Sequence, residues 1–103
     1  MKVLGERAAA RPDRAASMVV HDEPNLRIVS FHLLPGQRIP PHRSASTVSV
    51  QVVRGTGTFR GAEDEAVLGP GEGAVFAPGE THAIEAADGP LEFLALIAPR
   101  PGG

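Results

Sequence analysis

The chain has 103 residues and a formal net charge of −2, from 10 basic and 12 acidic side chains. This length supports one domain with one modest core and at most one pocket. The near balance of charge argues against a dedicated nucleic-acid binder, which would carry a clear basic excess, and the absence of cysteine excludes disulfides and thiolate metal sites.

The N-terminal stretch, residues 1–17, alternates charged residues with alanine and has neither helical nor strand periodicity. We expect a short irregular arm over residues 1–17 and one domain over residues 18–103. The arm lacks the continuous apolar stretch of a signal peptide, and no run in the chain reaches the length of a membrane span. The expected location is therefore the cytoplasm, with neither a membrane nor a nucleic acid as partner.

The rest of the chain reads as short extended runs separated by turns. Residues 18–20 start one run, residues 22–25 form a turn, and residues 26–34 return as the second strand of a hairpin. Residues 47–53 alternate apolar and polar side chains, which is the period of a strand buried on one face. Further short strands are expected at residues 58–60, 65–68, 73–76, 82–86 and 91–98.

Eight or nine short strands punctuated by 12 glycines and 10 prolines indicate an all-β sandwich or barrel. Alternation along the strands predicts an apolar inner face made of Val29, Phe31, Leu33, Val48, Val50, Val52, Phe93, Ala95 and Ile97. We expect the pocket itself to be lined by Phe31, Ser44, Val48, Val50, Phe93 and Ala95. The sheet edges of so small a protein need covering, and we therefore expect a homodimer or a higher homo-oligomer.

Two stretches carry a lone histidine after a turn of proline and glycine. The first, residues 35–55, contains His42, and the second, residues 71–82, ends in His82. Each histidine stands where extended apolar chain begins, so the two imidazoles meet if the strands pack together. A neutral imidazole is a good ligand for zinc, copper, nickel or iron.

These stretches resemble the paired motifs of the cupin superfamily, which are small β-barrels of jelly-roll type. The matching positions are Gly36, His42 and Gly55 in the first motif and Gly71, Gly79 and His82 in the second. Together with the flanking strands, the resemblance covers roughly residues 26–99. It implies a small cupin-like jelly-roll β-barrel with a metal site and a small-molecule pocket inside.

The chain departs from the family pattern mainly in its first motif. Ser44 stands where the family places its second histidine, and Val48 stands where it places its glutamate. Of the four usual metal ligands only His42 and His82 remain. The resemblance then implies a divalent metal ion (Zn, Mn, Fe, Ni or Cu) that is weakly held, because a two-histidine site leaves two or more positions to water.

Two functions stay open at this point. In one, His42 and His82 hold a divalent ion beside a small-molecule ligand or substrate, with the reaction and the catalytic residues unassigned. In the other, the barrel is metal-free and binds a small molecule, or regulates through it, without catalysis. No Ser-His-Asp arrangement is readable, because Ser44 and His42 have no identifiable orienting carboxylate.

Other polar residues near these motifs are weaker candidates. Arg38 and Arg43 flank the first histidine and could attract an anionic substrate to the mouth of the pocket. Glu80 could act as a general base, but its Pro-Gly turn favours solvent exposure. His21, beside a turn, is expected to be exposed, and His32 is expected to lie on the strand face opposite the pocket.

Overall fold

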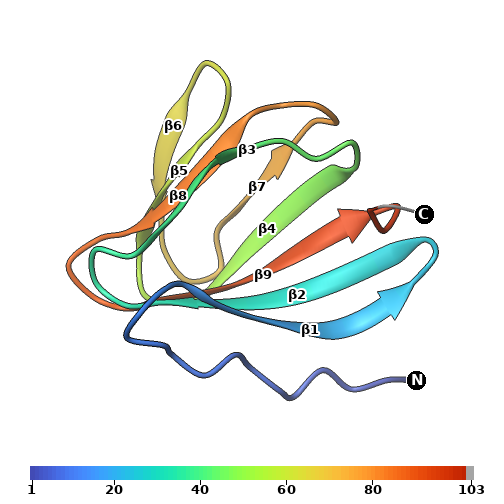
Figure 1. Cartoon of the computed structure of the whole chain (residues 1–103), viewed down its shortest axis with the longest axis horizontal. Coiled ribbons are helices and arrows are strands. Elements are labelled where there is room, and N and C mark those ends of the chain that lie inside the picture. Colours follow the sequence, from blue (N-terminus) through green and yellow to red (C-terminus); the bar gives the residue numbers. More distant parts are fainter. Residues whose placement is uncertain (102–103) are drawn as a thin grey trace.

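The computed structural model describes residues 1–101 and contains two antiparallel sheets that face each other (Figure 1). The strands within this described range are β1 (Ala16–Glu23), β2 (Leu26–Leu33), β3 (Arg38–His42), β4 (Thr47–Arg54), β5 (Gly57–Arg60), β6 (Glu65–Leu68), β7 (Gly73–Phe76), β8 (His82–Ala86) and β9 (Leu91–Ala98). One sheet has the order β1-β2-β9-β4-β7 and the other the order β3-β8-β5-β6. The predicted all-β fold is confirmed. None of the described segments is a helix able to cross a membrane.

The strand pairs are nested in the sequence, from the middle of the chain towards its two ends. β5 pairs with β6, β4 with β7, β3 with β8 and β2 with β9. Successive pairs alternate between the two sheets, so the chain forms one long hairpin rolled upon itself, as in a jelly roll. This nesting brings β3 beside β8, and with them the two histidine-bearing stretches.

The core lies between the inner faces of the sheets. Phe93 is at its centre, with its ring stacked on Phe31 at a centroid distance of 4.9 Å and meeting Phe59 edge to face at 5.4 Å. Offset-stacked and edge-to-face pairs of this kind add about 0.5–1.5 kcal/mol beyond area burial. Of the predicted inner-face residues, Leu33, Val48, Val50, Val52, Phe93 and Ala95 belong to the buried core, Phe31 and Ile97 pack against it, and Val29 is also buried.

The strand assignment differs from the sequence expectation at β3 and at both ends of β1, whose last residues, 22–23, were expected in a turn. β3 was not predicted, because Pro40 and Pro41 lie within it and proline cannot donate to a sheet ladder. β3 is an edge strand of the four-stranded sheet, where proline is tolerated. β1 begins at Ala16, inside the stretch expected to be an irregular arm, because Ala16 and Ser17 pair with β2.

The arm that precedes β1 is fastened to the outer face of β2 by a few polar contacts. The backbone N–H of Ala8 donates to Oγ of Ser30 at 3.0 Å, and Nδ1 of His32 lies 3.2 Å from the carbonyl oxygen of Ala8. Nε2 of Gln37 donates to the carbonyl of Arg11 at 2.7 Å. These contacts bury Ala8 and hold the arm along β1 and β2 (Figure 1).

Candidate functional site

The site is built on the pairing of β3 with β8. Ile39 of β3 lies opposite Ile84 of β8, and His42 lies opposite His82. Three steps along β3 therefore correspond to two steps along β8, so β3 contains one extra residue, at Pro40-Pro41. Such a bulge shifts the alternation of side chains along the bulged strand. Without it, position 41 rather than His42 would face His82 across the ladder. The bulge therefore turns His42 to the same side as His82.

The two imidazoles are in direct contact. Their ring centroids are 4.1 Å apart and their planes are inclined at 63°. Nδ1 of His42 lies 3.0 Å from the carbonyl oxygen of Pro40, and Nδ1 of His82 lies 3.0 Å from the carbonyl oxygen of Glu80. A carbonyl can only accept a hydrogen bond, so each Nδ1 carries the proton and, in the neutral ring, Nε2 keeps its lone pair.

His82 is the more enclosed of the pair. Only 4% of its surface is exposed, and its ring stacks on Phe76 of β7 at a centroid distance of 4.5 Å with 10° between the planes. Burial, assisted by the nearby charge of His42, lowers the pKa of His82 below its ordinary value, although the hydrogen bond to the Glu80 carbonyl acts in the opposite direction. His82 is therefore held in its neutral, lone-pair-bearing form.

The two histidines line a cavity of about 250 Å³ between the sheets, at the end where β3 finishes and β8 begins, and Arg43 and Ser44 directly follow β3 there. The cavity is lined by Phe31, Ile39, His42, Arg43, Ser44, Val48, Val50, His82, Ile84, Phe93, Ala95, Ile97 and Pro101. Thus Phe31, Ser44, Val48, Val50, Phe93 and Ala95, the six residues expected to line a pocket, all lie around one cavity together with both histidines. Apart from His42, Arg43, Ser44 and His82, the side chains of the lining are apolar.

The remaining polar candidates lie elsewhere. His21 contacts Glu23 at 3.1 Å on the β1–β2 hairpin, and His32 faces the arm. Glu80 accepts the backbone N–H groups of Ala77 at 2.9 Å and Ala62 at 3.1 Å, and these hydrogen bonds lower its pKa. Glu80 therefore stabilises two turns and does not line the cavity with the histidines.

Arg43 is the charged residue of the cavity lining. Its Nε donates to Oγ1 of Thr81 at 3.1 Å, which fixes the guanidinium beside the residue that precedes His82. The other arginine that flanks the first histidine, Arg38, lies on the outer side of the four-stranded sheet and opposite Glu85 in the ladder. Only Arg43 of the two flanking arginines therefore reaches the cavity.

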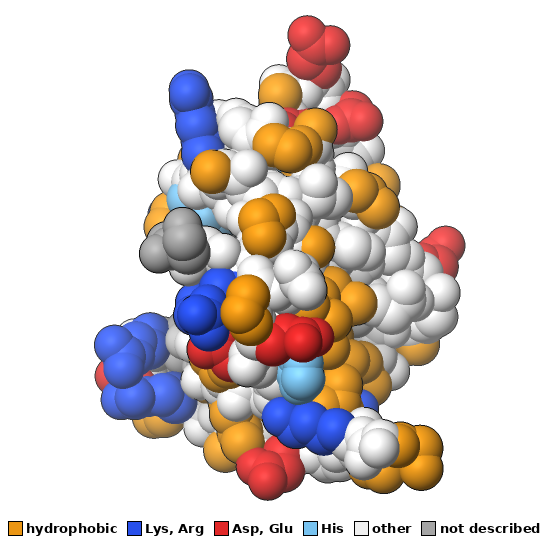
Figure 2. Space-filling view, turned by 90° about the vertical axis from the view of Figure 1, so that its right-hand side faces the viewer, with side chains coloured by type: hydrophobic (Ala, Val, Ile, Leu, Met, Phe, Trp, Pro, Cys, Tyr) orange, Lys and Arg blue, Asp and Glu red, His pale blue; other side chains and the backbone are white. Residues whose placement is uncertain are grey.

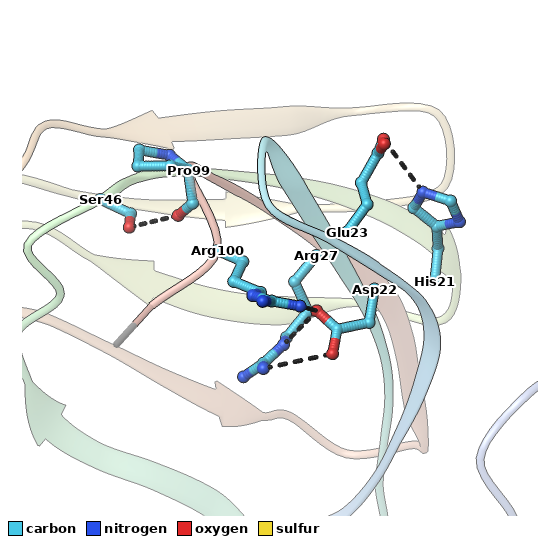
Figure 3. A network of polar contacts seen from close by, with 7 residues as sticks. All are labelled: His21, Asp22, Glu23, Arg27, Ser46, Pro99 and Arg100. Carbon is cyan, nitrogen blue, oxygen red and sulfur yellow. Dashed lines mark hydrogen bonds and ion pairs between the residues drawn. The ribbon is translucent and has the colours of Figure 1, made fainter. Parts of the chain in front are cut away.

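The tail after β9 closes part of the cavity wall through Pro101, and several contacts hold this tail in place (Figure 3). The hydroxyl of the buried Ser46 donates to the carbonyl of Pro99. The backbone N–H of Arg100 donates to the carbonyl of Pro24 at 3.3 Å, and its guanidinium lies 3.6 Å from Asp22. Asp22 also accepts from Arg27 at 3.2 Å, and the two arginines lower its pKa.

Comparison with protein families gives a match for residues 29–97 to the family model described as Cupin domain. The matched range contains β3, β4, β7 and β8, and therefore both histidines and most of the cavity. No curated protein matches the chain.

Solved structures similar to this chain share its whole architecture. The TT1209 protein from Thermus thermophilus is 29% identical with a TM-score of 0.90, and the alignment covers 98% of each chain. An RmlC-like cupin protein from Desulfovibrio desulfuricans is 28% identical with a TM-score of 0.84, covering 96% of this chain and 97% of that one. A double-stranded β-helix domain protein from Klebsiella pneumoniae subsp. pneumoniae is 22% identical with a TM-score of 0.88, covering 100% and 92%.

Proposed function

The chain belongs to the cupin family, and from this premise we propose that it binds a small molecule in the cavity between its sheets, beside a divalent metal ion held weakly by His42 and His82. The observation that carries the proposal is the common orientation of the two imidazoles. In both rings the Nδ1–H donates a hydrogen bond to a backbone carbonyl. The lone pair of each Nε2 is therefore available to a metal ion at the polar end of the apolar cavity. Histidines that ligate metals almost always donate their other ring N–H in this way.

The residues present fit an ion with incomplete protein coordination. Two neutral nitrogen donors in contact suit zinc, copper, nickel or iron. Among residues 1–101 no group of three or more His, Cys, Asp or Glu lies together, because Ser44 and Val48 occupy the positions of the other family ligands. The remaining coordination positions would fall to water or to the small molecule. When bound, the ion would act as a Lewis acid and polarise an oxygen of that molecule.

The protein groups around this end have separate tasks in the proposal. His42 and His82 present lone pairs, Ser44 offers a hydroxyl donor, and the apolar walls exclude water from the rest of the cavity. Nothing among the described residues supplies a nucleophile activated by a base. We therefore propose binding and leave the reaction unassigned.

A metal-free binding or regulatory barrel is the second candidate. It is favoured by the packing of His82 between Phe76 and His42, since the buried ring already has contacts on two sides and a satisfied Nδ1 without an ion. In that case the two imidazoles act as polar anchors for the ligand.

We also propose that the protein is a cytoplasmic homodimer. Supporting the dimer, both sheets end in edge strands, and Val67 on β6 and Val75 on β7 are each 68% exposed. Apolar side chains also reach the surface on the face drawn in Figure 2. Light scattering that gives a monomer mass throughout the micromolar range would contradict the dimer.

Metal analysis of untagged, freshly purified protein tests the principal proposal. We expect the protein to contain a stoichiometric divalent ion that a chelator removes. Calorimetric titration of the chelated protein should then show that the ion binds again. If the protein binds no zinc, nickel or manganese at millimolar concentrations but still binds small molecules in the cavity, the metal-free candidate replaces it.

A further inference from the structure

We infer that the small molecule is an organic monocarboxylate with a compact apolar body, whose carboxylate pairs with Arg43 at the polar end of the cavity. This inference rests on the proposed function, because it names the class of ligand for the same site. Three features of the described residues carry it: the charge of the lining, the position of Arg43, and the size of the apolar part.

The cavity lining contains a cation and no anion. Within residues 1–101, Arg43 is the charged member of the lining, and neither Asp nor Glu occurs in it. The imidazoles of His42 and His82 carry no negative charge in either protonation state. Val48 occupies the position at which a glutamate would bring a carboxylate into the cavity. The polar end is therefore positive, and no carboxylate of the described lining supplies a counter-charge.

The guanidinium of Arg43 is oriented but retains donors for a ligand. Its Nε donates to Oγ1 of Thr81 at 3.1 Å, and no Asp or Glu of the described range lies within ion-pair distance of it. The two terminal nitrogens have four further N–H groups in a planar fork that matches a carboxylate. The hydroxyl of Ser44 lies in the same lining and can donate to the same head group.

Metal binding strengthens the same conclusion. A divalent ion on two neutral imidazoles would add positive charge to a lining that already contains Arg43. Arg43 itself is exposed, but opposite charges attract more strongly where the apolar walls partly exclude water, so a negatively charged head group is favoured over a neutral one. An anionic head group is thus expected both with and without the ion.

The rest of the cavity limits the body of the ligand. Phe31, Phe93, Val50 and Ile84 offer aromatic and aliphatic contacts, and no polar partner faces them from the described lining. A volume of about 250 Å³ is below the lower end, about 300 Å³, of pockets that hold drug-sized ligands. A single ring or a short branched chain fits this space better than a polyhydroxylated or extended molecule.

The test compares two probes of nearly equal shape, cyclohexanecarboxylate and cyclohexylmethanol, by amide chemical-shift titration at low salt. Both probes are titrated into the full chain, once with a chelator present and once with added zinc. The wild type should bind the carboxylate at least about tenfold more tightly than the alcohol, since hydrogen bonds to charged groups contribute about 1.5–3 kcal/mol and 1.4 kcal/mol is a factor of ten. The shifts should follow the inner-face residues Ile84 and Ala95 rather than Leu94, which faces outwards.

Arg43→Gln should remove the preference, so that the carboxylate binds no more tightly than the alcohol. Arg43→Lys should keep part of the preference, because it retains the charge but loses the planar fork. Arg38→Gln is the matched control, since it removes the same charge from the outer side of the sheet and should behave as the wild type. Circular dichroism of each variant confirms that it is folded.

Two results separate failure of this inference from failure of the proposed function. If both probes enter the cavity with equal affinity, or if Arg43→Gln keeps the carboxylate preference, the assignment of an anionic ligand is wrong and the small-molecule site stands. If neither probe perturbs cavity residues with or without zinc, the small-molecule site itself is contradicted, and this inference with it.

Discussion

His42 and His82 are cross-strand partners in the β3–β8 ladder, and their rings are in contact at a centroid distance of 4.1 Å. This relationship joins two stretches that are distant in the sequence. It depends on the bulge at Pro40-Pro41 and on the carbonyls of Pro40 and Glu80, which fix the two rings with Nε2 free. The histidine pair is therefore a product of the register of β3 as well as of the two sequence motifs.

Replacement of either histidine should abolish most metal binding. His42→Ala and His82→Ala each leave one imidazole, and a single imidazole cannot hold a labile divalent ion against water. We expect a loss of more than about 100-fold in zinc affinity by calorimetric titration, because removing even an outer-shell partner of a ligand costs 10–100-fold. His21→Ala is the control, since His21 is on the β1–β2 hairpin and contacts Glu23. Tight binding that survives His82→Ala would show that the ion is held elsewhere.

The combined variant Ser44→His/Val48→Glu should bind metal much more tightly than the wild type. Both positions line the cavity that contains His42 and His82, so the new side chains face the pair. Without metal, the buried glutamate should lower the melting temperature, because burying a carboxylate costs several kcal/mol unless it is paired or protonated. Zinc or manganese should raise that melting temperature far more than it raises that of the wild type.

A matched control for this reconstruction is Ser44→His/Ser49→Glu. Ser49 is the neighbour of Val48 on β4 but pairs with Leu96 and Val75 on the opposite face. This control keeps the added imidazole but places its carboxylate outside the cavity, so metal should raise its melting temperature less than that of the Val48→Glu version. If the Val48→Glu version gains no metal-dependent stability while remaining folded, positions 44 and 48 do not converge on the histidine pair.

The metal-free protein should lose stability as the pH falls through the ordinary titration range of histidine. Burial lowers the pKa of His82 in the folded state, whereas an unfolded histidine titrates near pH 6.5. Between these two values the unfolded chain binds more protons, so the free energy of unfolding decreases as the pH is lowered, and the contribution of His82 is complete above about pH 6.5. The groups that face His82 are His42 from β3 and Phe76 from β7.

Urea unfolding at several pH values between about 5 and 8, with a chelator present, measures this slope. His82→Phe keeps a ring against Phe76 and removes the titrating group, so its stability should depend less on pH over the same interval. Asp22 and Glu80 have pKa values below the ordinary carboxyl range, and their contributions are lost only at lower pH. Equal slopes in the variant and the wild type would mean that His82 is not held neutral by the fold.

Ser46→Ala should destabilise the protein by about 1–3 kcal/mol. The Ser46 side chain is buried and donates to the carbonyl of Pro99, which would lose this partner. Ser49→Ala on the half-exposed outer face of β4 is the control and should change the free energy of unfolding by less than about 0.5 kcal/mol. Chemical denaturation compares the two variants. If they behave alike, the contact between the β3–β4 loop and the tail contributes little to the fold.

The sequence by itself determined the class of fold and the composition of the inner face. The period of two in residues 47–53 and the Pro/Gly turns are local properties, so they predict strands and buried sides without knowledge of the partners. The same local pattern placed Phe31, Val48, Val50, Phe93 and Ala95 on the side that lines the cavity. The spacing of glycines around His42 and His82 identified the family, which the match to residues 29–97 confirms.

Only the tertiary structure decided which residues meet. β3 contains two prolines and was not predicted as a strand, because its pairing with β8 depends on hydrogen bonds to a distant strand. The extra residue in its bulge reverses the facing of every side chain after it, and so brings His42 rather than Pro41 opposite His82. Likewise Arg38 and Arg43 look equivalent in the sequence, and only the register of β3 and the contact with Thr81 place Arg43 alone at the cavity. Strand register is a property of the paired chain, since it is set by partners that lie far apart in the sequence.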